Sequence, residues 1–112
     1  MTENLSEATM LTTTPSLFKG AARQRFDLLE SRVRLSRYGC DCYAYAMLAA
    51  GNVDLVVETA LNPYDIVALV PIIEYAGGVV RTWDGGRPEG GGNIVAAASE
   101  ALFEQAMAVM NG

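Results

Sequence analysis

The stretch VDLVVETALNPYDIVALVPIIEYAGGVVRT, residues 53–82, decides the fold of this chain. It begins with a short apolar strand at 53–57, and Asn62-Pro63 then supplies a favoured N-cap residue and a favoured first helical residue. The helix that follows stops at Gly77-Gly78, and 79–82 is typical of a further strand. Because short apolar strands alternate with helices, we expect an α/β fold with a covered, layered sheet.

The same alternation of strands and helices continues on both sides of this stretch. The expected elements are a strand at 8–13, a helix that Ser16 caps and that extends to Leu29, a strand at 33–36, a helix at 40–50 that ends at Gly51, a strand at 93–98, and a helix that Ser99 caps and that extends to Val109. Residues 1–7 are polar and we expect a flexible N-terminus there, followed by one α/β domain at 8–112. The pattern does not fix the order of the strands.

The composition of the 112 residues argues against several classes of protein. Hydrophobic residues make up 51% of the chain, which is enough for a packed core and argues against disorder. The net charge of −5 and the lack of a Lys/Arg cluster give no support to nucleic-acid binding. No apolar run approaches the ~20 residues of a membrane span, and Cys40 and Cys42 are spaced too closely for a good disulfide. We therefore expect a cytoplasmic protein with reduced thiols that binds neither membrane nor nucleic acid.

Two loops are candidates for a site, because ligands of such sheets bind beyond the carboxyl ends of strands and at helix N-termini. The first loop contains Gly39, Cys40 and Asp41 and follows the strand that ends near Ser36. Gly39 allows the backbone to approach a ligand closely, and free N–H groups of the next helical turn can face an anion. The alternative is a plain strand-to-helix turn in which Asp41 complements the helix dipole.

The second candidate loop runs from Glu58 to Asp65. Glu58 ends a strand and Asp65 lies in the first turn of the next helix, so both carboxylates can face one cleft. Carboxylate oxygens are the ligands that Mg²⁺ prefers. The alternative is structural, because Asn62 followed three residues later by an acid resembles a capping box.

Longer runs of sequence carry a resemblance to a known family. Residues 65–78, DIVALVPIIEYAGG, resemble the second signature of the inositol monophosphatase family, in which an aromatic-Asp pair opens a helix that closes on Glu-x-Ala-Gly-Gly. Residues 37–46, RYGCDCYAYA, and 51–58, GNVDLVVE, resemble the histidinol-phosphatase branch, as does Pro63-Tyr64-Asp65. The resemblance extends from about Ala8 to the C-terminus and implies the C-terminal half of the layered α/β sandwich of the sugar phosphatases.

The resemblance also implies roles for individual residues. Asp65 matches a Mg²⁺ ligand, and Glu58 matches the acid that hydrogen-bonds the polyol or amine of the substrate. Gly39 and Cys40 match the turn that approaches the substrate through its backbone, and Asp41 matches an acid expected to favour a cationic substrate such as histidinol phosphate. The implied reaction is magnesium-dependent hydrolysis of a phosphate monoester, as in histidine biosynthesis, and no residue of this chain is assigned a catalytic role.

Part of the family pattern has no counterpart in the sequence. The Asp-Pro-x-Asp-Gly-Thr type signature, which carries the other metal ligands, is missing, and the only Asp-Gly pair is Asp84-Gly85. One carboxylate cannot hold Mg²⁺ tightly. We therefore expect the isolated chain to have little or no phosphatase activity, to need a separate N-terminal half, and to form a homo-oligomer, as family members often do.

Three interpretations of the function remain open. The first is part of a histidinol-phosphate phosphatase, and the second is part of an inositol-monophosphatase-type sugar phosphatase. The third is a module without catalytic activity that serves binding or oligomerisation. If a second half normally covers this one, the isolated chain exposes an apolar patch.

Overall fold

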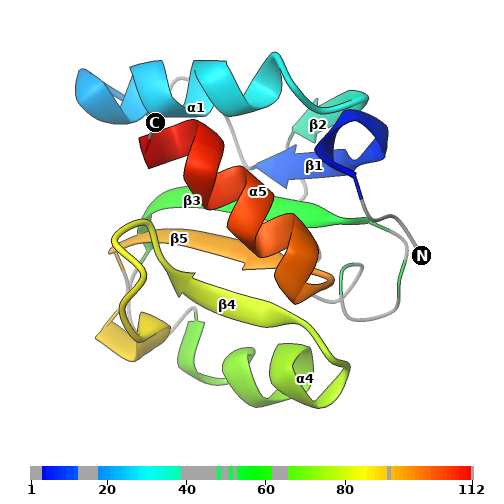
Figure 1. Ribbon diagram of the computed structural model, residues 1–112. Coiled ribbons are helices and arrows are strands. Elements are labelled where there is room, and N and C mark those ends of the chain that lie inside the picture. The colour runs from blue at the N-terminus through cyan, green and yellow to red at the C-terminus, as the bar shows by residue number, and fades with distance from the viewer. Residues whose placement is uncertain are drawn as a thin grey trace.

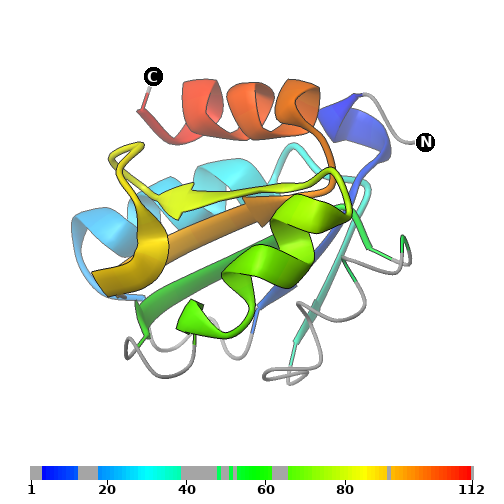
Figure 2. The same cartoon turned by 90° about the horizontal axis from the view of Figure 1, so that it is seen from below.

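A computed structural model describes residues 4–12, 18–38, 48, 51, 53–61, 66–90 and 92–111. In this part of the chain a five-stranded sheet carries α1 and α5 on one face and α4 on the other (Figures 1 and 2). The strands are β1 (Thr9–Thr12), β2 (Leu35–Tyr38), β3 (Leu55–Leu61), β4 (Val79–Thr82) and β5 (Gly92–Ala97), and the helices are α1 (Ala21–Glu30), α4 (Val70–Tyr75) and α5 (Glu100–Asn111), with 3-10 helices at Leu5–Glu7 and Pro88–Gly90. The predicted layered α/β fold is confirmed.

The strands lie in the order β2-β1-β3-β5-β4, which the sequence pattern does not reveal. β1 runs parallel to β2 and to β3, whereas β5 runs antiparallel to β3 and to β4. The carboxyl ends of β1, β2, β3 and β4 therefore meet the amino end of β5 at one edge of the sheet. This shared edge, called the carboxyl edge below, is the place where ligands bind in many α/β sheets.

The face of the sheet under α1 and α5 has an aromatic centre. The Phe18 ring stacks on the Phe26 ring of α1, with centroids 4.4 Å apart, and on the Trp83 ring at 5.6 Å. Leu102 and Ala106 of α5 are fully buried in the same cluster. Stacked aromatic pairs contribute beyond their buried area. Among the described residues, this face, the closed face, holds the larger of the two core clusters.

The opposite face packs against α4. Successive side chains of a strand point to opposite faces, and in β3 Val57 joins the closed-face cluster while Val56 joins the cluster with Val70 and Ile73 of α4. The chain turns sharply after α4, at Gly77, whose φ of 90° suits glycine. The helix stop predicted at Gly77-Gly78 is confirmed, as is the strand at 79–82.

Other element boundaries differ from the sequence pattern. α1 begins at Ala21, because Gly20 has φ 58° and ψ −131°, and the predicted cap Ser16 lies outside the described residues. β2 begins two residues later than predicted, where the amides of Arg34 and Leu35 donate to the carbonyl of Ala8 and start the pairing with β1.

The predicted capping of α5 is confirmed by the hydrogen bonds of Ser99. Its hydroxyl accepts a hydrogen bond from the amide of Leu102 at 3.3 Å, and its carbonyl accepts one from the amide of Phe103 at 3.1 Å. These contacts satisfy orphan N–H groups of the first helical turn. Within the described residues, none of the helices is long and apolar enough to cross a membrane.

Candidate functional site

The carboxyl edge brings the ends of β2, β1 and β3 to nearly the same level. Tyr38 of β2 lies opposite Thr12 of β1, and Leu11 lies opposite Val56 of β3. Continuing this register places Thr12 beside Val57, one residue before Glu58. Since neighbouring strands are about 4.8 Å apart, the end of β2 and Glu58 lie about 10 Å apart, a distance that one small ligand can span.

Glu58 is the acidic side chain that the described part of this edge buries. It lies in β3 opposite Ile94 of β5 and is only 3% exposed. Strand alternation directs its side chain to the α4 face, the face on which Val56 and Ile94 lie. β3 continues to Leu61 and does not end at Glu58 as the sequence pattern suggests. Burying a carboxylate is costly unless it has partners, and Glu58 does interact with other groups of the structure. Its burial at the carboxyl edge makes it a candidate for a functional residue.

An irregularity in the sheet follows Glu58 directly. The β3–β5 register shifts between Glu58 and Leu61, where Leu61 pairs with Gly92. Thr59 donates a hydrogen bond of 2.6 Å to the side-chain oxygen of Asn93, across the two strands. Bulges of this kind direct side chains near sites. The Thr59–Asn93 bond therefore holds the backbone next to Glu58 in place. No sequence motif predicts this bond.

The end of β1 adds a second polar group to the carboxyl edge. The hydroxyl of Thr12 is buried and has no hydrogen-bond partner among the residues that the structure describes. Buried polar groups normally have partners. Thr12 is therefore a polar group that the sequence analysis missed, because nothing in the sequence distinguishes it from a threonine chosen for strand propensity.

The other predicted site residues lie outside the described part of the chain. These are Gly39, Cys40 and Asp41, which follow β2 directly in sequence, and Asp65, which follows β3 by four residues. Of the described residues near them in sequence, Tyr38 and Leu61 lie at the carboxyl edge, and Leu48 and Ile66 belong to the cluster on the α4 face. The roles of the four residues stay predictions.

The outer end of β2 is held to α1 by a hydrogen-bond group. Tyr38 and Ser36 both donate to the Glu30 carboxylate, Ser36 at 2.9 Å. The hydrogen bond to Glu30 raises the pKa of Tyr38 above its usual value of 10.0, while the contact with Ser36 lowers it to a smaller extent. Both side chains are exposed or half-buried, so this group positions the strand end without forming an enclosed site.

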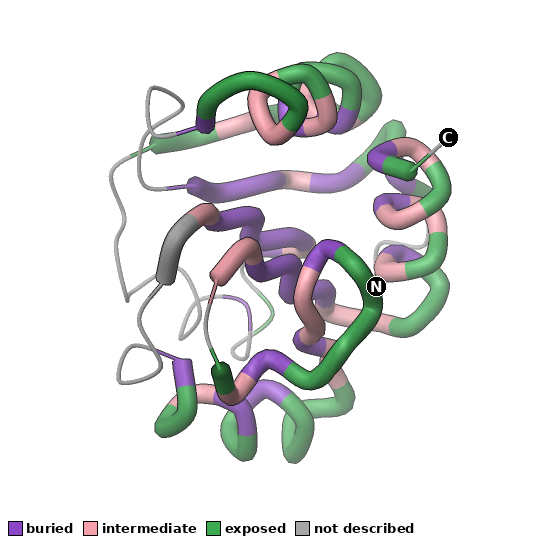
Figure 3. Tube along the Cα trace, turned by 90° about the vertical axis from the view of Figure 1, so that its left-hand side faces the viewer, coloured by how far each residue is buried: buried purple, intermediate pink, exposed green. Residues whose placement is uncertain are grey.

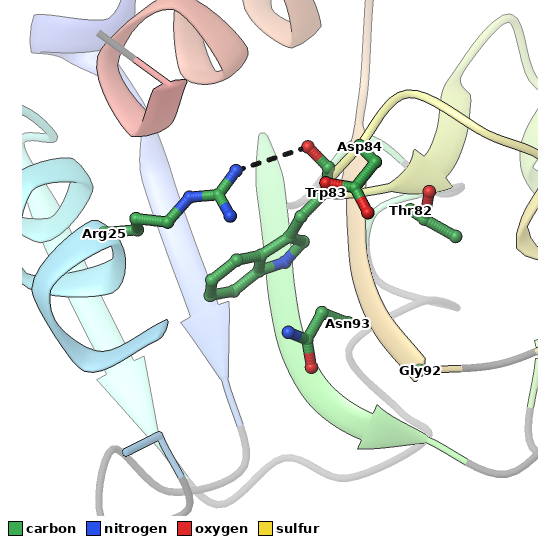
Figure 4. Close-up of a pocket in the computed structure, with 6 residues that line it drawn as sticks. All are labelled: Arg25, Thr82, Trp83, Asp84, Gly92 and Asn93. Carbon is green, nitrogen blue, oxygen red and sulfur yellow. Dashed lines mark hydrogen bonds between the residues drawn. The ribbon is translucent and has the colours of Figure 1, made fainter. Parts of the chain in front are cut away.

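A pocket of about 280 Å³ opens at the same edge of the sheet on the closed face, lined by Arg25, Thr82, Trp83, Asp84, Gly92 and Asn93 (Figure 4). The Arg25 guanidinium lies 5.3 Å from the Trp83 ring centre, which is the geometry of a cation–π contact. It also donates to the carbonyls of Met110 and Trp83 and to the side-chain oxygen of Asn111. Arg25 thus ties α1, β4 and α5 together, and we assign the pocket a structural role.

A magnesium ion, as implied by the family resemblance, needs several oxygen ligands. The described residues contain no group of three or more His, Cys, Asp or Glu side chains that could hold a metal ion. Glu58 alone does not make a magnesium site, and Asp65 lies outside the described residues. The described part of the chain therefore does not fit a complete metal site.

Comparison with known proteins finds a matching family model and several relatives of this chain. A model described as the inositol monophosphatase family matches residues 1–111. The "Bifunctional phosphatase IMPL2, chloroplastic" of Arabidopsis thaliana is 44% identical over 92% of this chain and 32% of its own length. A histidinol-phosphatase of Chlorobaculum parvum is 26% identical over 96% of this chain and 42% of its own length.

A solved structure agrees with the observed fold. The structure of an inositol monophosphatase from Zymomonas mobilis superposes with a TM-score of 0.90 and 39% identity, and the match covers 96% of this chain and 44% of that one. The chain therefore spans less than half the length of each of these relatives, and corresponds to their C-terminal part.

Proposed function

The chain belongs to the inositol monophosphatase family, and from this premise we propose that it is the substrate-binding part of a phosphomonoesterase that acts on histidinol phosphate. Enzymes of this family are generally magnesium-dependent and act on phosphorylated small molecules. The observation that carries the proposal is the buried carboxylate of Glu58 at the carboxyl edge of the sheet. Several curated relatives are histidinol-phosphatases.

The chemistry of the substrate explains why a buried acid is useful. Histidinol phosphate carries an amine, and a charged hydrogen bond from an ammonium group to a carboxylate is about twice as strong as a neutral one. A carboxylate that is only 3% exposed is screened little by water. In the proposal Glu58 binds the amine, and Asp41 supplies a second negative charge that favours a cationic substrate.

Described residues that flank the predicted ones in sequence support the proposal. Tyr38 and Leu61 lie at the carboxyl edge, and Leu48 and Ile66 belong to the cluster on the α4 face. Leu48 and Ile66 both pack on the face to which Glu58 points. In the proposal the backbone around Gly39 and Cys40 contacts the substrate, and Asp65 contributes one magnesium ligand. The remaining ligands, and hence the catalytic water, come from the part of the fold that this chain does not span.

A chimera provides the test of this proposal. The chain replaces the matching C-terminal segment of the Arabidopsis phosphatase, to which it is 44% identical, and phosphate release from histidinol phosphate is measured with magnesium. We expect the chimera to be active and the 112-residue chain alone to release no phosphate. Glu58→Gln should lower kcat/KM for histidinol phosphate by about 30-fold or more, because it removes the charged partner of a buried ammonium.

The matched control is Glu104→Gln, which neutralises an exposed acid on α5 and should leave kcat/KM within about twofold of the unaltered chimera. An equal effect of the two substitutions would contradict the role of Glu58. Phosphate release by the isolated chain would contradict the proposal that it supplies only part of the machinery.

A second candidate substrate is an inositol or other sugar phosphate. The solved relative with a TM-score of 0.90 is an inositol monophosphatase, and the Arabidopsis relative is described as bifunctional. A polyol has no positive charge, so Glu58→Gln should affect its turnover much less than that of histidinol phosphate. If the chimera prefers inositol phosphate and Glu58→Gln affects both substrates equally, the second candidate is correct. A folded but inactive chimera would instead favour a binding module without catalytic activity.

A further inference from the structure

The central strands β3 and β5 change character next to Glu58. Figure 3 shows the middle of the sheet as buried, and the residues at 55–58 of β3 and 94–97 of β5 are all buried. Thr59 and Asn93, the next residues toward the carboxyl edge, are only half-buried. Apolar packing therefore ends at Glu58, and the strand beyond it needs another restraint if Glu58 is to keep one position.

The backbone ladder between the two strands is interrupted at the same place. Glu58 of β3 pairs with Ile94 of β5. The next pair is Leu61 with Gly92, so two residues of β3 lie opposite Asn93 alone. This two-against-one count is that of a β-bulge, in which the regular hydrogen bonds between strands are locally lost. The backbone of Glu58 thus has regular pairing on one side along the strand and an interruption on the other.

A side-chain hydrogen bond spans this bulge. The Thr59 hydroxyl donates to Oδ1 of Asn93 at 2.6 Å. Both side chains lie on the closed face, because Val57 and Val95, two residues away on each strand, belong to the closed-face cluster. The side chain of Glu58 points to the α4 face instead. The bond therefore lies on the other side of the sheet from the Glu58 carboxylate and acts on Glu58 through the backbone.

The β5 end of this bond is anchored from the neighbouring strand. Trp83 donates its backbone amide to the carbonyl of Asn93 at 3.0 Å and its indole N–H to the carbonyl of Ile94 at 3.2 Å. The Trp83 ring is buried, and the Arg25 guanidinium lies 5.3 Å from its centre (Figure 4). The start of β5 is therefore held from β4, and the hydrogen bond ties Thr59 to this held position.

We propose that Thr59 and Asn93 are a positioning pair for Glu58, and that their hydrogen bond maintains a preference for a cationic phosphate ester over a neutral one. This inference rests on the proposed function, in which Glu58 binds the substrate amine. A side chain that binds a substrate has to be held within about 0.5 Å of its productive position. A neutral polyol makes a weaker hydrogen bond to a carboxylate than an ammonium group does, so its turnover depends less on this position.

The test uses the chimera with the Arabidopsis phosphatase and compares kcat/KM for histidinol phosphate and for inositol phosphate. Thr59→Val removes the hydroxyl and keeps a branched side chain of similar size. We expect kcat/KM for histidinol phosphate to fall about tenfold, mainly through a higher KM, because a displaced carboxylate binds the amine less well. The value for inositol phosphate should stay within about twofold. Thr59→Ser keeps the hydroxyl and should retain the preference of the unaltered chimera.

A second variant tests whether the two residues act through one bond. Asn93→Leu removes the acceptor and should lower the preference for histidinol phosphate in the same direction. Adding Thr59→Val to Asn93→Leu should cause no further loss, because the bond is already broken. A double variant whose loss is the product of the two single losses would show independent roles and would overturn the pair.

Ser99→Ala is the matched control for lost stability. It removes a hydroxyl that caps α5, beyond the carboxyl end of β5 and hence at the edge of the sheet opposite the carboxyl edge. It should lower the thermal midpoint but leave the ratio of the two kcat/KM values within about twofold. If Ser99→Ala and Thr59→Val change this ratio equally, or if Thr59→Val lowers both kcat/KM values equally, the role of Thr59 is only structural and the inference is overturned.

A measurement on the 112-residue chain separates this inference from the proposed function. The side-chain carboxyl carbon of Glu58 is followed by NMR and is assigned by its absence in Glu58→Gln. Thr59→Val should shift this resonance, whereas Thr59→Ser, a substitution at the same position, should not. If the chimera is inactive, the proposed function fails, and a shifted resonance still supports the positioning pair while an unchanged one overturns it. If the chimera prefers histidinol phosphate and Thr59→Val leaves that preference unchanged, the function stands and the positioning pair is overturned.

Discussion

The two faces of the sheet differ in the helices that pack on them. The closed face carries two helices of 10 and 12 residues over a stack of three aromatic rings, Phe18, Phe26 and Trp83. The other face carries the six-residue α4, which is apolar on its outward side as well. The first arrangement is that of a protein surface, and the second is that of an interior layer. Within the described residues, the two faces therefore differ in how much apolar surface their helices leave exposed.

The α4 face is nevertheless packed tightly where it meets the sheet. A Cβ atom on Gly78 would lie 2.8 Å from the carbonyl oxygen of Ala97 and 2.9 Å from a methyl group of Ile73. Such close approach leaves room only for glycine. The difference between the faces therefore lies in the outer surface of α4 and not in the quality of its inner contacts.

The largest effect is expected from breaking the aromatic stack of the closed face. Phe26→Ala removes a fully buried ring that stacks on Phe18, and should lower the free energy of unfolding by about 3–5 kcal/mol, as measured by urea denaturation. Tyr75→Ala removes an exposed ring from α4 and should change the free energy of unfolding by about 0.5 kcal/mol or less. Similar losses for the two variants would mean that the two faces do not differ as described.

A smaller effect is expected from filling the close contact beneath α4. Gly78→Ala forces a methyl group against two backbone carbonyls and the Ile73 side chain, and should lower the free energy of unfolding by about 1–3 kcal/mol. Gly90→Ala is the control, because a Cβ there has no neighbour within 4 Å and Gly90 has no positive φ. If the urea midpoint is the same for the two variants, the inner side of α4 is not tightly packed.

The sequence predicted best those elements whose signals are local. The strand at 79–82 was correctly placed because Gly77-Gly78 ends the preceding helix and four residues of strand pattern follow. The capping of α5 by Ser99 is local in the same sense. β2 was placed two residues too early because its register is set by pairing with β1, through hydrogen bonds to Ala8 that sequence periodicity does not contain.

The same distinction applies to the candidate site. Glu58 could be singled out because it follows a short apolar strand and matches an acid of the family pattern, and its burial at the carboxyl edge agrees with that signal. The Thr59–Asn93 bond and the unpartnered hydroxyl of Thr12 could not be predicted, because they depend on which strands are neighbours. The strand order β2-β1-β3-β5-β4 is a property of the whole sheet, and local patterns carry no information about it.

The smallest effect concerns the rim of the closed face, where Tyr38 of β2 donates to Glu30 of α1. This bond raises the pKa of Tyr38 above 10.0, so the folded chain favours the neutral phenol. The stabilisation is therefore fully present below pH 10 and is lost as the pH rises through the raised pKa of the folded state. Since Tyr38 is about half exposed, Tyr38→Phe should cost only about 0.5 kcal/mol at pH 8.

The measurement is the urea midpoint of Tyr38→Phe and of the unaltered chain between pH 8 and pH 11. The difference between the two proteins should shrink above pH 10, because the deprotonated phenol no longer donates to Glu30 and the two negative charges repel. Tyr75→Phe is the control, because it removes the same hydroxyl from an almost fully exposed ring and should leave the urea midpoint close to that of the unaltered chain. A difference for Tyr38→Phe that grows with pH would contradict the bond and would leave the hydrogen bond from Ser36 to Glu30 as the described side-chain link between β2 and α1.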